Sequence, residues 1–513
     1  CLKFSSIVTD WDKFVTGWAR KGRQEGALVR DYCLDDPQWR QASREQMQRI
    51  TRLNLAHEPV AYDIRDELST TISANPFDYD FNPVTLAKFR DWLKTQYRNL
   101  AALNEEWETR FAEWSEVRPF TTDQIKHRMA TGEAVPRGKP DWQALQQLKF
   151  SPATARQSPT RWNFAPWADF RTYMDISLAG ALDDLRQAAH ALDPRTPVGI
   201  EGTQMPGAFG GYDLERLANA LDWVEPYDIG NAREIFGSFM PGKPLMTTIG
   251  EQDANHAARR LWHLLLEGDR GCLVWWSEDC INWSSDDYAL TPRAKALRPV
   301  LREMTSPAAR LLLRAERVSD PIYIHYSQPS IQADWLLEST GDGSTWLRRF
   351  SSFEAEHNRM LRVRNAWLKL FQDLGYSPRF ITSQQLDRLA KSGSNDGVLV
   401  LPQAIALSAR DVEAVQHFLH PYFPGVKRTV FADGTPGAFD EHCKLRATNA
   451  LERLFPTSLS SEASYAWQMR TGPRRAGEPT RDTRTRDIAQ YGTERAQVAP
   501  SSAWLDWARE QMD

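Results

Sequence analysis

The stretch Pro59-Val60-Ala61-Tyr62-Asp63-Ile64-Arg65-Asp66-Glu67 decides the fold of this chain, because a short apolar run ends there in acidic residues. Similar runs recur downstream and alternate with amphipathic stretches. Strands are expected at residues 59–64, 197–200, 223–227, 244–249 and 272–276, and helices at residues 84–103, 167–192, 213–221 and 254–267. This alternation is typical of βα units that form a parallel sheet. The sequence therefore predicts an α/β protein built on a (β/α)8 TIM-type barrel.

The position of the strand that ends at Glu67 follows from counting backward along the chain. If the strand at 272–276 is the eighth of the barrel, the Glu67 strand is the fourth and the strand at 244–249 is the seventh. Only about 55 residues precede the Glu67 strand, whereas three βα units of a barrel of about 250 residues need roughly 90 to 100. We therefore expect an N-terminally truncated chain in which the early strands are only partly present.

The chain divides into three predicted parts. Residues 1–316 form the barrel, with a polar, proline-containing insertion at about 117–162 that is expected to be a long excursion from the barrel and to form part of a substrate cleft. Residues 317–445 repeat the strand and helix pattern on a smaller scale, which predicts a flavodoxin-like, doubly wound α/β domain. Its strands are expected at 321–326, 379–381, 397–402 and 429–432, and its helices at 354–374 and 408–418. Residues 446–513 are expected to be a C-terminal extension that is partly loop.

Composition excludes several classes of function. The formal net charge is −4 and no basic stripe occurs, so no nucleic-acid partner is expected. No apolar run reaches about 18 residues, so no membrane-spanning helix is expected either. The five cysteines are scattered without metal-site spacing, and no glycine-rich phosphate motif is present; we therefore predict no metal and no cofactor. The 20 tryptophans are compatible with a carbohydrate partner, because aromatic rings offer flat apolar faces to sugars.

Five glutamates lie just after predicted strands, where barrels place their catalytic groups: Glu67, Glu201, Glu225, Glu251 and Glu278. Retaining glycosidases need two carboxyl groups about 5 to 5.5 Å apart, one as acid/base and one as nucleophile. Strands four and seven face each other across a barrel mouth. This geometry favours Glu67 as the acid/base and Glu251 as the nucleophile.

Each of these two residues has a simpler interpretation. Glu67 could pair with Arg65 or serve the start of a helix, and Glu251 could serve the start of the helix at 254. If Glu251 only serves the helix start, Glu201 or Glu225 is the nucleophile. If Glu251 is the nucleophile, Glu201 and Glu225 are expected to bind sugar hydroxyls or to lie next to residues that do. The residues expected to contact the substrate are Arg65, Asp66, Glu201, Glu225, Tyr227, Trp275 and Trp276.

Two further features lie at the carboxyl ends of the predicted strands, where the five glutamates are found. The glycine-rich loop at 205–212 follows the fifth strand and suits a mobile or closely packed loop at a cleft. Trp275, Trp276 and Trp283 end or follow the eighth strand, where an aromatic platform for a sugar would lie. At least one of these three is expected in the core.

The chain resembles the family forty-two β-galactosidases of glycoside hydrolase clan A. The best stretch runs from Phe89-Arg90-Asp91-Trp92-Leu93 through Tyr97 to Leu103-Asn104-Glu105-Glu106-Trp107-Glu108-Thr109 and Trp114, similar to the segment that follows the family's acid/base strand. Asp66-Glu67 stands where the family has Asn-Glu, and Glu251-Gln252 is similar to the family's nucleophile segment. Ile324-His325-Tyr326-Ser327, Asp334-Trp335, Val400-Leu401-Pro402 and Ala432–Gly437 resemble its flavodoxin-like trimerisation domain, which implies a homotrimer.

One departure from the family matters for function. The clan's Asn donates a hydrogen bond to the sugar 2-hydroxyl, and an ionised Asp66 can only accept one. The resemblance implies a retaining β-galactosidase-like hydrolase, and the insertion at 117–162 suggests an oligo- or polysaccharide substrate. The alternative is a degenerate carbohydrate-binding barrel with a scaffolding role. An amidotransferase-like role of the second domain is disfavoured because no cysteine lies at a strand-to-helix turn there.

Overall fold

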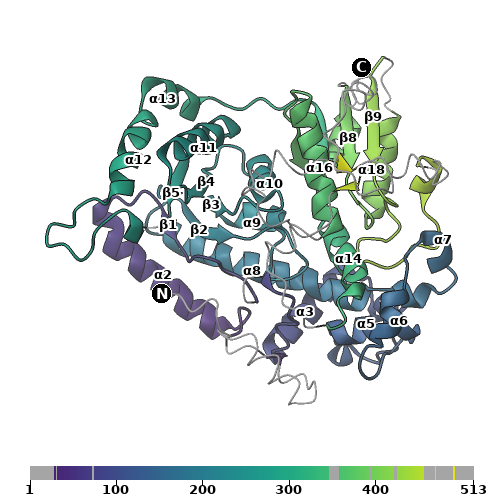
Figure 1. Cartoon of the computed structure of the whole chain (residues 1–513). Helices are drawn as coiled ribbons and strands as arrows, with labels where there is room; N and C mark the ends of the chain where they lie inside the picture. The colour runs from purple at the N-terminus through teal and green to yellow at the C-terminus, as the bar shows by residue number, and fades with distance from the viewer. Residues whose placement is uncertain are drawn as a thin grey trace.

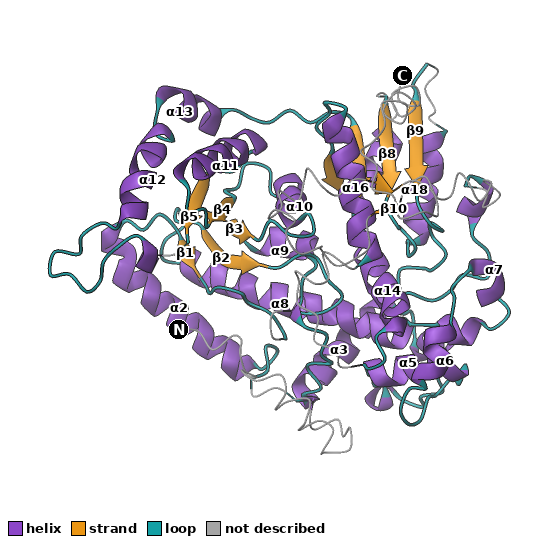
Figure 2. Ribbon diagram, viewed as in Figure 1, coloured by secondary structure: helices purple, strands orange, loops and turns teal. Residues whose placement is uncertain are grey.

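The computed structural model describes residues 28–29, 32–71, 74–275, 277–345, 358–392, 396–420 and 425–455, together with the short strands β10 (Gln468–Met469) and β11 (Ala489–Gln490). Figures 1 and 2 show two parallel sheets with helices packed around them. The first sheet occupies the left half of the view, and the second lies at the upper right. Helical segments fill the lower right.

The first sheet consists of strands that follow each other in sequence order. They are β1 (Tyr62–Asp63), β2 (Val198–Thr203), β3 (Trp223–Pro226), β4 (Met246–Ile249) and β5 (Gly271–Val274). Parallel pairing joins β1 to β2, β2 to β3 and β4 to β5. The Val224 amide donates to the Pro244 carbonyl at 3.4 Å and links β3 to β4. In the described part of the chain these strands form one arc of a (β/α) barrel, and the predicted parallel βα order is confirmed.

The helices that connect these strands cover the sheet. They are α8 (Ala165–His190), α9 (Leu214–Ala220), α10 (Ala232–Phe239) and α11 (Ala254–Glu267), and α2 (Pro37–Asn54) packs along α8. Side-chain caps at Asp213 and Asp253 start α9 and α11. The sequence interpretation missed α10. Its N-cap, Asn231, has a φ of 63° and makes no side-chain cap hydrogen bond, so the usual start signal is absent.

The insertion at 117–162, predicted as a long polar excursion from the barrel without assigned helices, is largely helical. It contains α5 (Thr122–Thr131), α6 (Trp142–Gln147) and α7 (Pro152–Ala155). A capping box between Thr121 and Gln124 starts α5, and Asp141 and Ser151 cap the other two helices. These local signals outweigh the prolines, which lie at helix starts or between helices. The helices pack on an apolar cluster that includes Trp335 and Phe439 from the second half of the chain.

The predicted helix at 84–103 is two helices. α3 (Pro83–Gln96) ends where Tyr97 adopts an extended backbone, and α4 (Leu100–Trp107) begins at Asn99, whose side chain accepts from the Ala102 amide at 2.9 Å. An asparagine that satisfies a free amide favours a new helix start over continuation. After β5 come α12 (Pro292–Glu303) and α13 (Pro307–Arg314).

The second sheet is parallel, with the strand order β7-β6-β8-β9. Its elements are β6 (Ile322–His325), α14 (Gln328–Glu338), α16 (Arg359–Asp373), β7 (Arg379–Ile381), α17 (Ser383–Ser392), β8 (Gly397–Leu401), α18 (Ala409–Leu419) and β9 (Arg428–Ala432). Residues 354–357 of the predicted helix at 354–374 lie outside the described residues. One apolar cluster contains Leu182 and Ile200 of the barrel arc together with Ile324 and Trp367 of the second unit. The core is therefore continuous across residue 316.

None of the described helices is long and apolar enough to cross a membrane.

Candidate active site

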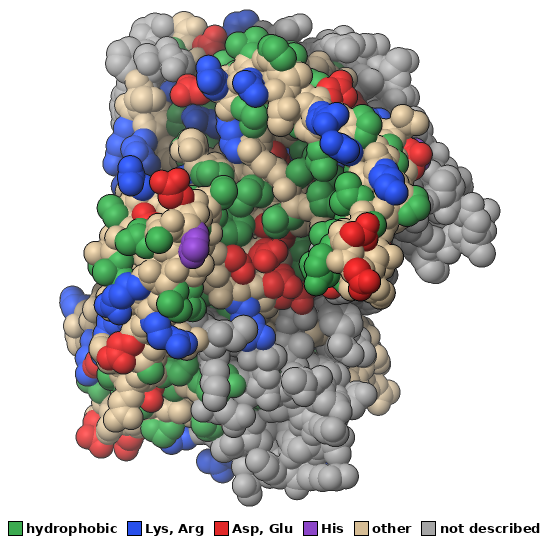
Figure 3. All heavy atoms as spheres, turned by 90° about the vertical axis from the view of Figure 1, so that its left-hand side faces the viewer, with side chains coloured by type: hydrophobic (Ala, Val, Ile, Leu, Met, Phe, Trp, Pro, Cys, Tyr) green, Lys and Arg blue, Asp and Glu red, His purple; other side chains and the backbone are tan. Residues whose placement is uncertain are grey.

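The carboxylates of β1 and β2 meet at the carboxyl ends of these strands. Asp63 pairs in register with Gly199, which brings the turn at Asp66 and Glu67 beside Glu201. The Glu67 amide donates to the Glu201 carbonyl at 3.2 Å, and the Glu201 amide donates to the Asp63 carboxylate at 3.2 Å. Figure 3 shows acidic side chains gathered in a hollow on the face that lies to the left in Figure 1. The sequence interpretation did not single out Asp63, the last residue of β1.

Gly202 permits this close approach. Its φ is +63°, and an added Cβ would lie 2.2 Å from the Asp66 carboxylate, 2.8 Å from the Glu67 amide nitrogen and 2.9 Å from the Glu67 Cγ. Only glycine fits this position without displacing the turn that carries Glu67.

Glu67 itself is exposed and has a backbone φ of 49°. The Tyr227 hydroxyl, which follows β3, donates to the Glu67 carboxylate at 2.6 Å. Burial, reinforced by the charge of Glu67, raises the pKa of Tyr227, so the phenol stays a neutral donor. The structure thus brings together Glu67 and Tyr227, two of the residues expected at the site. No helix begins at Glu67, which removes one of its simpler interpretations.

The carboxyl groups of this cluster compete for protons. The surrounding protein partly desolvates the Asp63 carboxyl, although it keeps contact with solvent, and the charges of Glu201 and Asp66 add to the effect. Together they raise the pKa of Asp63 to about 7. The pKa of Asp66 is raised by desolvation and then by Glu67 and Glu201, while the nearby charge of Arg65 opposes the rise. Like charges held close together favour partial protonation at neutral pH.

Glu225 is buried and its carboxylate is occupied by backbone amides. One oxygen accepts from Gly202 at 2.6 Å and the other accepts from Thr248 at 3.1 Å. These contacts join β2, β3 and β4 at their carboxyl ends, as expected of a structural cross-link. Burial raises the pKa of Glu225, and the two amide bonds oppose that rise. A direct contact of Glu225 with substrate stays a prediction.

Glu251 follows β4 by two residues and does not cap the next helix. Asp253 is the N-cap of α11, because its carboxylate accepts from the His256 amide at 2.9 Å. Within the described residues, Oε2 of Glu251 is buried without a hydrogen-bond partner. Arg293 donates to the Glu251 carbonyl at 3.3 Å and to the Trp275 carbonyl at 2.5 Å, which ties the end of β4 to the end of β5. The helix-start interpretation of Glu251 is therefore not supported by its contacts.

The tryptophans after β5 differ in position. Trp275 is 55% exposed, and so is Trp283, so neither of these two is in the core. Trp276 lies outside the described residues. The loop at 205–212 is closely packed: a Cβ on Gly210 would lie 2.7 Å from that of Ala74, and one on Gly211 would lie 2.5 Å from the Leu178 side chain.

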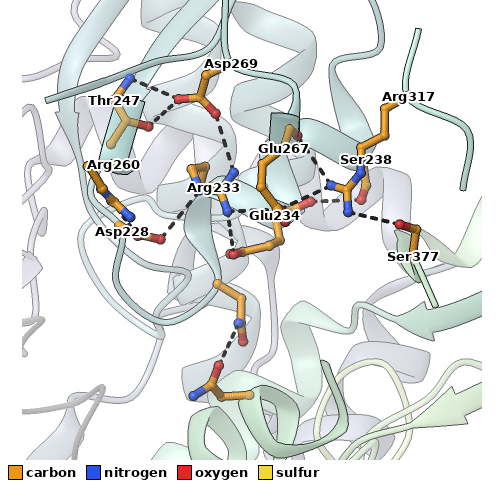
Figure 4. Close-up of polar contacts among 12 residues, drawn as sticks. Asp228, Arg233, Glu234, Ser238, Thr247, Arg260, Glu267, Asp269, Arg317 and Ser377 are labelled. Atoms are coloured by element: carbon orange, nitrogen blue, oxygen red, sulfur yellow. Dashed lines mark hydrogen bonds and ion pairs between the residues drawn. The ribbon is translucent and has the colours of Figure 1, made fainter. Parts of the chain in front are cut away.

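A buried charge network lies next to β4 (Figure 4). Arg233 of α10 is 2% exposed and contacts the carboxylates of Asp228, Glu234, Glu267 and Asp269 at 2.9 to 3.6 Å. Asp269 in turn accepts from the amide and hydroxyl of Thr247 in β4. The network fixes the strand that leads to Glu251. Among the described residues, no group of three or more acidic, histidine or cysteine side chains is arranged to hold a metal ion.

Comparison with known proteins gives a consistent result. The model of the family described as Beta-galactosidase, glycoside hydrolase family 42, matches residues 16–143. No curated protein matches the sequence. The exo-carrageenase of family 42 from Bacteroides ovatus is similar in structure, with 16% identity and a TM-score of 0.53 over 84% of this chain and 58% of that one.

Two β-galactosidases are similar to the same degree. The enzyme from Bacillus circulans sp. alkalophilus has 15% identity and a TM-score of 0.53 over 81% of this chain and 57% of its own. The enzyme from the psychrophilic Marinomonas ef1 has 12% identity and a TM-score of 0.52 over 83% of this chain and 64% of its own. The chain spans less than two thirds of the length of these proteins. Residues 16–143 thus match the model of family 42, and the described part of the chain has a fold similar to that of family 42 enzymes.

Proposed function

We propose that this chain is a retaining glycosidase that hydrolyses O-glycosyl bonds of a β-linked, galactoside-like oligo- or polysaccharide. The observation that carries the proposal is Glu67, an exposed carboxylate at the carboxyl end of β1 that a tyrosine hydroxyl holds in place. Catalytic groups of (β/α) barrels lie at this end of the strands. The β-galactosidases among the structural neighbours support the substrate class.

In the proposed double displacement, Glu67 donates a proton to the glycosidic oxygen while the Glu251 carboxylate attacks the anomeric carbon. The carbon–oxygen bond to the leaving group breaks and a glycosyl ester forms on Glu251. Glu67, now ionised, takes a proton from water, which attacks the same carbon and releases Glu251. The assignment of Glu251 as nucleophile is supported because Asp253, and not Glu251, caps the helix that follows.

Several neighbours are proposed to hold the sugar. Arg65, Asp66 and Glu201 lie around Glu67. Trp275 has an exposed side chain, and its carbonyl accepts from the same Arg293 that contacts the Glu251 carbonyl. Asp66 would accept hydrogen bonds from sugar hydroxyls rather than donate them.

Trapping of the glycosyl ester tests the assignment. A 2-deoxy-2-fluoro-β-galactoside with an activated leaving group should inactivate the protein, and peptide mass spectrometry should find the label on Glu251. Label on Glu201 or Glu225 would instead name that residue as the nucleophile. In Glu67→Gln, hydrolysis of unactivated galactosides should fall far more than that of activated aryl galactosides, because only the former need a proton on the leaving oxygen.

The stereochemistry of the product gives an independent check. Proton NMR of the first sugar released should show the β-anomer. Carbohydrate binding without any turnover would favour a degenerate, carbohydrate-binding barrel instead.

The proposal includes the organisation of the chain. Residues 1–316 are the catalytic unit, residues 317–445 a flavodoxin-like unit, and residues 446–513 an extension. The strand order β7-β6-β8-β9 corresponds to the first four strands of a flavodoxin-like sheet, which supports the second assignment. By resemblance this unit would mediate trimer formation, and light scattering coupled to gel filtration would reveal a mass three times that of the chain.

A further inference from the structure

The loop between β5 and α12 contains a hairpin that holds two aromatic rings in solvent. Ile281 and Leu290 form an antiparallel bridge at its base. Trp283 is 55% exposed and Tyr288 is 62% exposed, and their ring centroids lie 5.9 Å apart at an interplanar angle of 67°. The two rings therefore support each other edge to face while their outer surfaces remain open.

The hairpin has its own hydrogen bonds and does not need these rings to fold. The Asn282 amide donates to the Ala289 carbonyl at 2.9 Å, and the Ser285 hydroxyl accepts from the Ala289 amide at 3.0 Å and donates to the Asn282 carbonyl at 2.8 Å. Tyr288 has a φ of 49°, a backbone conformation that costs a non-glycine residue energy. Because both side chains are largely exposed, their burial contributes little to the stability of the hairpin. The strained backbone of Tyr288 and the exposed ring of Trp283 therefore point to a role in binding.

The base of the hairpin is fixed to the Glu251 segment. The Gln252 side chain donates through Nε2 to the Asp279 carboxylate at 3.4 Å. Arg293 contacts the Glu251 carbonyl, the Cys280 sulfur at 3.7 Å and the Asp279 carboxylate at 3.9 Å. The loop projects to the left in Figure 1, on the face that Figure 3 shows from the front, with acidic side chains in a hollow. The hairpin that carries the aromatic pair is thus anchored to the Glu251 side of the proposed site.

The hairpin is negatively charged, which favours uncharged glycans over sulfated ones. Asp286 and Asp287 are exposed at its tip, and no lysine or arginine lies between residues 277 and 292. Exposed carboxylates repel sulfate groups, whereas aromatic faces accept the apolar C–H face of an uncharged pyranose.

We propose that Trp283 and Tyr288 form a binding surface for a neutral glycan chain that extends from the catalytic mouth. The inference rests on the proposed glycosidase function, and it narrows the substrate from galactosides in general to uncharged polymers or long oligomers. Sulfated galactans are excluded by the acidic tip.

Binding measurements on the full chain test this surface separately from hydrolysis. Glu67→Gln is used as the background, so that the glycan is not consumed, and affinity for a soluble β-1,4-linked galactan is measured by affinity electrophoresis and calorimetry. Trp283→Ala should weaken binding about tenfold, which corresponds to the loss of one strong aromatic contact. Trp283→Phe should recover part of the loss, because it restores a ring. Leu311→Ala, at a residue that is 70% exposed on α13, is the matched control and should bind as the background does.

The outcomes separate the two proposals. If aryl galactosides are not hydrolysed but Trp283→Ala still weakens galactan binding, the glycosidase proposal fails and the binding surface stands. Equal galactan affinity in the Trp283→Ala, Tyr288→Ala double variant and the background would overturn the surface. So would κ-carrageenan, a sulfated galactan, binding as tightly as the neutral polymer, or the absence of any galactan binding.

Discussion

Replacement of Gly202 by alanine should disturb the turn at Asp66 and Glu67 while a matched glycine elsewhere tolerates the same change. Gly202 and Gly242 both have positive φ, at +63° and +78°. Alanine in this conformation costs about 1 to 2 kcal/mol at either position. At Gly242 no atom lies within 4 Å of the added Cβ, so backbone strain is the whole effect.

At Gly202 the same methyl group has no room. It would lie 2.2 Å from the Asp66 carboxylate and 2.8 Å from the Glu67 amide nitrogen, both below the 3.0 Å that real Cβ contacts respect. The Asp66 side chain can rotate away, but the Glu67 amide is held by its hydrogen bond to the Glu201 carbonyl and must shift. A displacement of about 1 Å in a catalytic group costs roughly a hundredfold in rate. We therefore expect kcat/KM of Gly202→Ala to fall by about tenfold to a hundredfold.

The assay compares the two variants directly. Hydrolysis of an aryl β-galactoside gives kcat/KM, and urea unfolding gives the free energy of unfolding. Gly242→Ala should lose about 1 to 2 kcal/mol of stability with activity unchanged. If both variants show the same activity and the same stability, the close approach at Gly202 has no role in positioning Glu67, and the reasoning is refuted.

Three further changes probe the same end of the sheet. Tyr227→Phe removes the hydrogen bond to Glu67; bonds to charged groups contribute about 1.5 to 3 kcal/mol, so kcat/KM on an aryl galactoside should fall roughly tenfold to a hundredfold. An unchanged rate would show that the hydroxyl does not position the carboxylate. Asp63 has a pKa raised to about 7, above its value in the unfolded chain, so its protonated form favours the folded state at low pH. The folded state therefore loses stability from this group as pH rises from about 4 to 7, and the loss levels off above that. Asp63→Asn should abolish this part of the pH dependence of the urea midpoint, and identical profiles for both proteins would contradict it. Arg233→Met leaves four carboxylates without their buried partner and should cost about 3 to 5 kcal/mol of stability. Arg317→Met, at a more exposed arginine of the same network, should cost less than about 1 kcal/mol, and equal losses would show that burial is not the cause.

Local patterns in the sequence were sufficient to predict the order of strands and many helix boundaries. Apolar runs of four to six residues separated by helical stretches are typical of buried parallel strands. The predicted helix at 254–267 agrees with α11, because Asp253 caps its start and Gly268 ends it. At 117–162 the prolines and polar residues concealed three helices, each started by a side-chain cap. Helix α10, without a cap hydrogen bond, gave no local signal.

The sequence by itself determined which carboxylates stand at strand ends, because a strand's end is a local property. It could not determine what each carboxylate contacts. Tyr227 meets Glu67 across 160 positions of sequence, and the Glu225 carboxylate is bound by the amides of Gly202 and Thr248. Such contacts depend on the register between strands and on the side to which each side chain points. Both are set when the sheet assembles, so only the tertiary structure separates an exposed carboxylate such as Glu67 from a buried cross-link such as Glu225.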